Sequence, residues 1–172
     1  MKRPLIFALL CCITGSAWAA SHAPRTHFQA LIYLTRHAEK VADDSRDPRL
    51  SDAGIRRAEQ LAERLDGSGV ALIITTPFER TRGTAEIVAA RIGATLIEAP
   101  VADGLEEHVR AVARLIADNP TQRILVVGHS NTLGPIIRAL DGPQIEPIAD
   151  DQYGDLYLLH VEDGLSHSRY GD

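Results

Sequence analysis

Short apolar runs alternate with amphipathic segments along this sequence, and the alternation limits the folds that the chain can adopt. The runs are rich in β-branched residues and are too short for core helices, which indicates buried strands. Between them, apolar residues recur at the spacing of one helix face. We expect strands at 30–35, 70–74, 94–99, 124–127 and 156–161, and helices at 79–92, 105–117, 133–140 and from a Ser51 cap to near Gly67.

Strands and helices that alternate along one chain are typical of an α/β fold. Because crossover helices cover both faces of a parallel sheet, the sequence predicts a three-layer α/β/α sandwich with a mostly parallel central sheet. No internal repeat or low-complexity tract divides residues 20–172, so we expect a single domain there. In such sheets, ligand sites lie beyond the carboxyl ends of the strands.

The first 19 residues have the pattern of a secretory signal peptide. Lys2 and Arg3 precede an apolar run at 4–13, and small residues follow, with Ala17-Trp18-Ala19 as an A-x-A cleavage site. We therefore expect cleavage after Ala19 and a periplasmic or secreted protein. The apolar run is shorter than the roughly 20 residues that a membrane helix needs, so no membrane span is expected.

Composition excludes two classes of protein. The chain is 45% apolar, which is too much for a disordered protein. Its 18 Lys and Arg against 23 Asp and Glu give a formal charge of −5, whereas a nucleic-acid binder normally carries a basic surplus. Both cysteines, Cys11 and Cys12, lie in the signal segment, so we expect no disulfide or thiol chemistry in the domain.

Arginine and histidine follow three of the expected strands. Arg36 and His37 come after the first, Arg80 after the second and His129 after the fourth, so topology gathers them at one sheet edge. Guanidinium groups match phosphoryl oxygens with paired hydrogen bonds, and a neutral imidazole is a competent nucleophile. We expect His37 to attack phosphorus while Arg36, Arg80 and a protonated His129 hold the equatorial oxygens. Water would then hydrolyse the phosphohistidine.

Three sequence blocks around these residues resemble the signatures of the histidine phosphatase superfamily, the phosphoglycerate-mutase-like fold. They are LTRHAEK at 34–40, TTPFERTRGTAE at 75–86 and VVGHSNT at 126–132, in the family's order. The resemblance implies that His37 is the phosphorylated nucleophile and that Arg36, Arg80 and His129 form the phosphate pocket. It also implies a metal-independent phosphatase without a cofactor, acting on a small phosphorylated substrate.

Two positions depart from the family's pattern. Gly83 stands where the second signature often has Gln, and Ala38 follows the nucleophile where Gly is commoner. Ala38 fits only if its backbone does not need a positive φ. Neither position supplies an expected catalytic side chain.

The general acid that would protonate the leaving oxygen has no clear candidate in the sequence. Larger relatives supply it from a glutamate-containing block after the third strand, and this chain has Asp103 and Glu106 in that region. A carboxyl group needs a raised pKa to act as an acid near neutrality. We expect the acid to be Asp103 or Glu106.

Three other functions compete with the phosphatase interpretation. Loss of the acid would leave a module that binds phosphorylated ligands without turnover. A zinc hydrolase would use His37, His129 and Asp103, but the chain lacks an H-E-x-x-H pair and two arginines would repel the metal. A mutase is less expected, because mutase relatives enclose the phosphoryl group with long insertions. We expect residues 143–153 to form a rim of the pocket.

Overall fold

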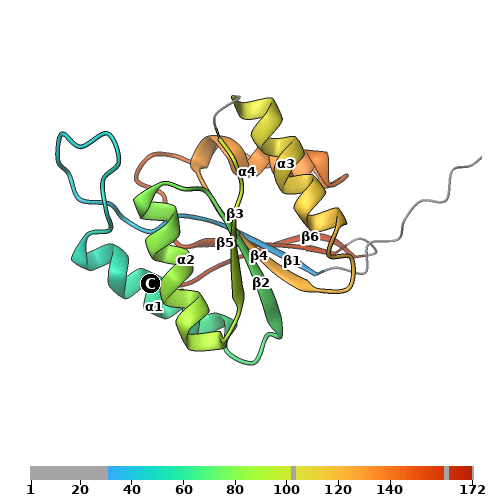
Figure 1. Cartoon of the computed structure of the whole chain (residues 1–172), viewed down its shortest axis with the longest axis horizontal. Helices are drawn as coiled ribbons and strands as arrows, with labels where there is room; N and C mark the ends of the chain where they lie inside the picture. The colour runs from blue at the N-terminus through green and yellow to red at the C-terminus, as the bar shows by residue number, and fades with distance from the viewer. Residues whose placement is uncertain (1–30, 102–103, 161–162, 172) are drawn as a thin grey trace, which may run out of the picture.

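The computed structural model describes residues 31–101, 104–160 and 163–171 (Figure 1). The signal-peptide prediction for residues 1–19 lies outside these ranges, as do the start of the predicted domain and the candidate acid Asp103.

Six strands form one mixed sheet within the described ranges, in the order β3-β2-β4-β1-β5-β6. Neighbouring strands among β3, β2, β4 and β1 are parallel. Strand β5 pairs antiparallel with β1, and β6 pairs antiparallel with β5. The predicted mostly parallel sheet is therefore confirmed. The strands are β1 (Ile32–Arg36), β2 (Val70–Thr75), β3 (Thr95–Glu98), β4 (Arg123–Gly128), β5 (Asp155–His160) and β6 (Gly164–Arg169).

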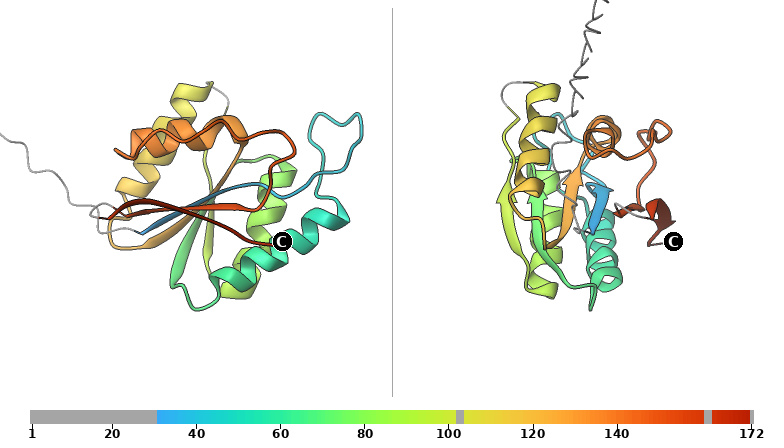
Figure 2. Two further views of the ribbon diagram at one scale, coloured as in Figure 1. Left: turned by 180° about the vertical axis from the view of Figure 1, so that it is seen from behind. Right: turned by 90° about the vertical axis from the view of Figure 1, so that its right-hand side faces the viewer.

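Two helices cover each face of the sheet, as Figures 1 and 2 show. Leu61 of the first helix and Val88 of the second pack on one face in a cluster that includes Ile73 of β2. Ile116 and Ile136, from the other two helices, pack on the opposite face. The three-layer prediction is thus confirmed. The helices in the described ranges are α1 (Asp52–Leu65), α2 (Glu79–Ile92), α3 (Leu105–Ala117) and α4 (Ser130–Ala139).

The start of α1 is fixed against the loop that follows β1. The Ser51 hydroxyl accepts a hydrogen bond from the amide of Gly54 at 3.1 Å, which is the N-cap predicted from the sequence. A Cβ atom on Gly54 would lie 2.0 Å from the carbonyl oxygen of Glu39. Only glycine permits this approach, so α1 holds the loop close behind the end of β1.

The end of the chain differs from the predicted pattern. The sequence predicts one last strand near 156–161, but the structure has a hairpin in which β6 adds an edge strand. The sequence GLSHSR of β6 is mostly exposed and polar, so it lacks the apolar run that marks a buried strand. Helix α4 also begins at Ser130, earlier than the predicted Leu133, because its first turn carries polar residues.

None of the helices in the described residues is both long and apolar enough to cross a membrane.

Candidate active site

The predicted cluster forms at the carboxyl edge of the parallel strands. Arg36 ends β1 in register with Gly128, which ends β4, so His37 and His129 follow paired positions. The amide of His37 donates to the carbonyl of Gly128 at 2.9 Å. Arg80 lies in the first turn of α2, which follows β2. The parallel topology therefore brings together side chains from three distant segments.

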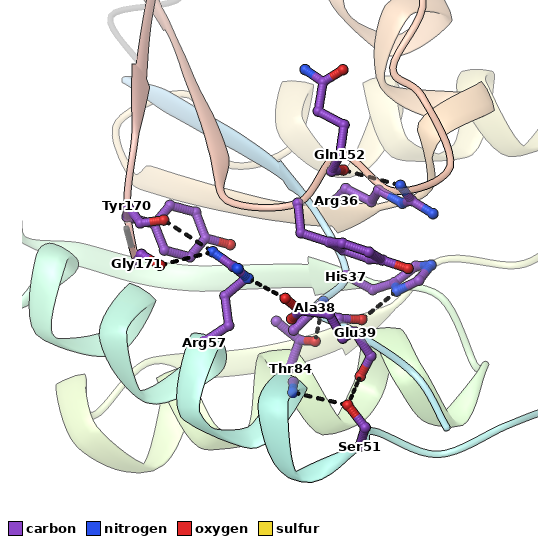
Figure 3. Close-up of polar contacts among 12 residues, drawn as sticks. Arg36, His37, Ala38, Glu39, Ser51, Arg57, Thr84, Gln152, Tyr170 and Gly171 are labelled. Carbon is purple, nitrogen blue, oxygen red and sulfur yellow. Dashed lines mark hydrogen bonds and ion pairs between the residues drawn. The ribbon is translucent and has the colours of Figure 1, made fainter. Parts of the chain in front are cut away.

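His37 is held in one tautomer by its neighbour. Its Nδ1 lies 2.7 Å from the carbonyl oxygen of Ala38, as Figure 3 shows. Because a carbonyl only accepts, Nδ1 carries the proton and the neutral ring keeps its lone pair on Nε2. The side chain is buried, and burial, together with the charges of Arg36 and Arg80, lowers its pKa to about 4. His37 is therefore neutral at neutral pH, with an unprotonated Nε2.

Arg36 is buried beside the nucleophile and bound to a loop. Its Nη1 donates to the carbonyl oxygens of Ala149 at 2.8 Å, Asp150 at 3.0 Å and Gln152 at 3.0 Å. The Tyr153 ring lies 4.3 Å from the guanidinium carbon. The Nε–H is buried and has no hydrogen-bond partner among the described residues. One edge of the guanidinium thus fixes its position, while its Nε–H is a buried donor without a partner among the described residues.

The loop that binds Arg36 is itself fixed to the sheet. The side-chain amide of Gln152 donates to Asp155 at 2.6 Å, and Nε2 of His167 lies 2.8 Å from the other oxygen of that carboxylate. Asp155 is only 3% exposed, at the start of β5. The predicted rim at 143–153 therefore contacts the site, although the sequence did not indicate that its backbone carbonyls bind Arg36.

A second arginine, Arg57, holds the loop behind His37. It donates to the Glu39 carboxylate at 2.7 Å and to the carbonyls of Tyr170 and Gly171 at 3.2 and 3.3 Å, as Figure 3 shows. The Glu39 carbonyl also accepts from the amide of Ser51 at 3.0 Å. The segment after the nucleophile is thus fixed from α1 and from the end of β6.

Arg80 is less enclosed than Arg36. It contacts the Asp47 carboxylate at 3.4 Å and lies over the Phe78 ring, 4.6 Å from its centroid. Asp47 also accepts from the amide of Glu79 at 2.9 Å, so it caps the start of α2. Burial lowers the pKa of Arg80 and the charge of Asp47 opposes this effect. The sequence did not single out Asp47, because nothing in its neighbourhood marks a partner 33 residues away.

His129 lies edge-on to the nucleophile, with ring centroids 5.4 Å apart. Its Nε2 lies 3.1 Å from the hydroxyl of Thr76, which in turn lies 2.6 Å from the hydroxyl of Thr81. Burial first, then the charges of His37 and Arg80, lower the pKa of His129 to about 3. His129 is therefore neutral in the protein on its own, and the imidazolium form expected during the reaction stays a prediction for the phosphate-bound site. A phosphate dianion beside the ring would raise its pKa again.

The backbone of Ala38 does not need a positive φ, so alanine fits at this position where the family more commonly has glycine. Asp141 is the only non-glycine residue with positive φ in the described ranges, so Ala38 has an ordinary backbone conformation. Its amide donates to the Thr84 hydroxyl at 3.1 Å. A Cβ on Gly83 would lie 3.3 Å from Leu50, away from the catalytic side chains.

The structure does not bring Glu106 to this cluster. Its side chain is 89% exposed, and its carboxylate lies 3.7 Å from Arg110 on the same helix. Asp103, the other candidate acid, lies outside the described residues. No group of three or more His, Cys, Asp or Glu in the described part of the chain is placed to hold a metal ion.

A cavity of about 340 Å³ opens beside Arg80 and His129. Its other walls come from the start of α2, the start of α3 and the first turn of α4. Among the described residues that line it, none is an aspartate or a glutamate. The lining residues are Phe78, Arg80, Val101, Gly104, Leu105, His108, His129, Asn131 and Thr132.

Comparison with known proteins relates this site to one superfamily. The sequence pattern of the histidine phosphatase superfamily (branch 1) matches residues 32–109. A probable phosphoglycerate mutase, GpmB, of Yersinia pestis (strain Pestoides F) is 35% identical over 75 residues, which are 40% of this chain. The match spans only 35% of that relative's length.

Solved structures of two phosphatases share the fold. The protein histidine phosphatase SixA complexed with tungstate superposes with a TM-score of 0.62 at 16% identity, covering 81% of this chain and 95% of SixA. Phosphoserine phosphatase of Entamoeba histolytica gives a TM-score of 0.56 at 17% identity, covering 83% and 97%. The sequence pattern matched over residues 32–109 supports the histidine phosphatase superfamily for this chain, and the shared fold and the geometry around His37 agree with it.

Proposed function

We propose that this protein hydrolyses phosphate monoesters through a phosphohistidine intermediate on His37. The observation that carries the proposal is that the His37 ring is neutral and has its proton on Nδ1. Its Nδ1 proton is committed to the Ala38 carbonyl, and burial and neighbouring cations lower its pKa to about 4. An unprotonated Nε2 among two arginines and a second histidine is suited to attack a bound phosphoryl group.

The surrounding groups have separate tasks in this reaction. Arg36 and Arg80 neutralise the phosphoryl oxygens, and their donors stabilise the charge of the transition state. His129 becomes protonated as the dianion binds and then donates to a third oxygen. The bond between phosphorus and the ester oxygen breaks as Nε2 attacks, and water later cleaves the phosphorus–nitrogen bond.

A hydrolase is favoured over a mutase by the segments around the site. Between Arg80 and Gly128 the described chain consists of α2, β3, α3 and β4 with short connections, so no long insertion there encloses the phosphoryl group. Water therefore reaches the intermediate. The matched Yersinia protein is named a probable mutase and the Entamoeba protein a phosphatase, so both activities belong in the assay.

Export forms part of the proposal and is supported by the sequence of residues 1–19. We infer that the phosphatase acts in the periplasm or outside the cell. N-terminal sequencing of the protein recovered from cell fractions tests this, and a cytosolic protein that retains residues 1–19 would contradict it.

The decisive experiment is a screen of soluble phosphate esters with the wild type and His37→Ala in parallel. We expect the variant to fold and to lose turnover by a factor on the order of 10⁴ or more. Trapping at alkaline pH, followed by detection of a protein-bound phosphate that is stable to alkali and lost in acid, should label the wild type alone. Equal turnover in both proteins would remove His37 as the nucleophile.

Two further arms of the screen separate the competing functions. Turnover that survives prolonged EDTA treatment excludes the zinc hydrolase. A protein that binds phosphate esters yet hydrolyses neither p-nitrophenyl phosphate nor an alkyl phosphate would be the binding module, which the lack of a described carboxylate in the cavity favours as the second candidate.

A further inference from the structure

We propose that His108 is the catalytic residue that contacts the leaving group and protonates its bridging oxygen. The inference rests on the proposed phosphatase function and adds the step for which the described cavity holds no carboxylate. His108 belongs to the first turns of α3, outside the three sequence blocks that resemble the family's signatures.

His108 is a third histidine of the site, and it is held in a fixed orientation. It lines the same cavity as His129 and Arg80, and its residue is only 5% exposed. Nδ1 lies 2.9 Å from the carbonyl oxygen of Pro100. Because that carbonyl only accepts, Nδ1 is the donor, and Nε2 is left for another partner.

The free nitrogen of His108 is accessible from the cavity. Nε2 has no hydrogen-bond partner among the described residues, and it is not one of the buried unpartnered atoms there. A positive charge on His108 is also one of the causes that lower the pKa of His129, which places the two rings within electrostatic range. A ligand held by His129 and Arg80 therefore presents its ester group to His108.

The carboxylates nearest to His108 on its own helix face elsewhere. Glu107 accepts two hydrogen bonds from Arg110, at 2.8 and 3.0 Å. Glu106 also points toward Arg110 and solvent. Neither lines the cavity, so in this part of α3 the ring of His108 is the proton donor that faces the substrate.

The proton balance of both steps is complete with this residue. In the imidazolium form, His108 donates Nδ1–H to Pro100 and gives the Nε2 proton to the bridging oxygen as the phosphorus–oxygen bond breaks. The alcohol leaves and the ring is neutral. It then accepts a proton from the water that attacks the phosphohistidine, which restores the imidazolium and releases inorganic phosphate.

The neighbours of His108 indicate the kind of leaving group that fits. Phe78, Val101 and Leu105 give the cavity apolar walls, while Asn131 adds a polar amide. This lining suits an alcohol with an apolar body, whose alkoxide is a poor leaving group and needs a proton. The inference therefore assigns unactivated alkyl phosphates as the substrate class.

The test compares two leaving groups in one variant. For His108→Gln, we expect kcat/KM on an alkyl phosphate to fall by roughly 10²- to 10⁴-fold. On p-nitrophenyl phosphate, whose leaving group needs no acid, the loss should stay under about fivefold. His160→Gln is the matched control, because His160 lies at the far end of β5 and pairs with Asp163.

The outcomes distinguish this inference from the proposed function. Equal losses on both esters, or no loss, would overturn the role of His108 while His37 stays the nucleophile. Selective loss in Asp103→Asn with His108→Gln unaffected would assign the acid to Asp103 instead. A wild type inactive on both esters would refute the phosphatase function and this role with it. Since the readout is a ratio within one protein, a general loss of folding does not mimic the expected result.

Discussion

Arg36 and Arg80 carry the same charge in one site, but the protein holds them in different ways. Arg36 is buried and its Nη1 is bound by three backbone carbonyls. Arg80 is half-buried and has one long contact, 3.4 Å, to the partly exposed Asp47. The proposed phosphate pocket thus has a rigid wall, formed by Arg36 beside His37, and an adjustable wall, formed by Arg80 beside the cavity.

Because the two arginines are held differently, a mutation in one wall should affect both stability and turnover, whereas a mutation in the other should affect mainly turnover. Replacing a group in the rigid wall leaves three backbone carbonyls without their charged donor, so it affects both folding and catalysis. Replacing a group in the adjustable wall removes a positive charge that would contact the substrate, but it lowers the free energy of unfolding only a little. The predictions below use this separation.

The largest effect is expected for Arg36→Gln. Turnover should fall on the order of 10³-fold, because a fixed donor to the transition state is lost. The free energy of unfolding should also fall by about 2 kcal/mol, since the three carbonyls lose a charged donor. Steady-state kinetics and urea denaturation measure the two effects. A variant with wild-type stability would show that the loop does not depend on Arg36.

Arg80→Gln should lose about 10²-fold in kcat/KM with a change in stability within about 1 kcal/mol. Its contact to Asp47 is long, 3.4 Å, and partly exposed, so it contributes little to the folded state. The same two measurements apply, which makes the pair of arginine variants a direct comparison. Equal destabilisation in both would remove the distinction between the two walls.

Acid should destabilise the protein through His37, beside the rigid wall, and His129, which lines the cavity. The pKa values of His37 and His129 are about 4 and about 3 in the folded state, below the ordinary 6.5 of an unfolded chain. As pH falls below about 6.5, the unfolded chain binds protons that the folded protein does not, so stability decreases. Between pH 7 and pH 5 each ring accounts for up to about 2 kcal/mol.

The control for this pH dependence is His129→Leu, which removes one of the two rings. Its free energy of unfolding should fall less steeply between pH 7 and pH 5 than that of the wild type. Chemical denaturation at several pH values measures both slopes. Identical slopes would mean that His129 does not stay neutral in the folded protein.

The smallest effect is expected for Gln152→Ala. Losing the bond to Asp155 frees the loop, but the carbonyls that bind Arg36 remain. We expect KM to rise less than about tenfold with kcat nearly unchanged, since the losses are one hydrogen bond to the Asp155 carboxylate and one from the amide of Ala149. Gln122→Ala, before β4, is the matched control. A large loss of kcat would show that the loop acts in the chemical step.

Much of the fold and the centre of the site were predictable because both follow from side-chain pattern. The helices at 79–92 and 105–117 have the predicted limits, and the strand ends deliver Arg36, His37 and His129 to one edge. Side-chain identity and spacing encode these features directly. The polar edge strand β6 was missed because exposed strands lack an apolar run.

The supporting contacts were not predictable, for a physical reason. Any residue has a carbonyl, so the sequence 149–152 does not show that its backbone binds Arg36. His108 is also one of several scattered histidines until the fold places it in the cavity. Glu106 matched the expected position of an acid, but helix geometry directs it toward Arg110. Such contacts depend on tertiary packing.

The central position of β1 determines when its hydrogen bonds open relative to those of the edge strands. β1 is hydrogen-bonded on both sides, parallel to β4 and antiparallel to β5, whereas β3 and β6 lie at the sheet edges. Amide hydrogens in the middle strand should therefore exchange with deuterium only through global opening, after those of the edge strands. His37 follows directly from that strand, so fraying of either sheet edge leaves its imidazole in place.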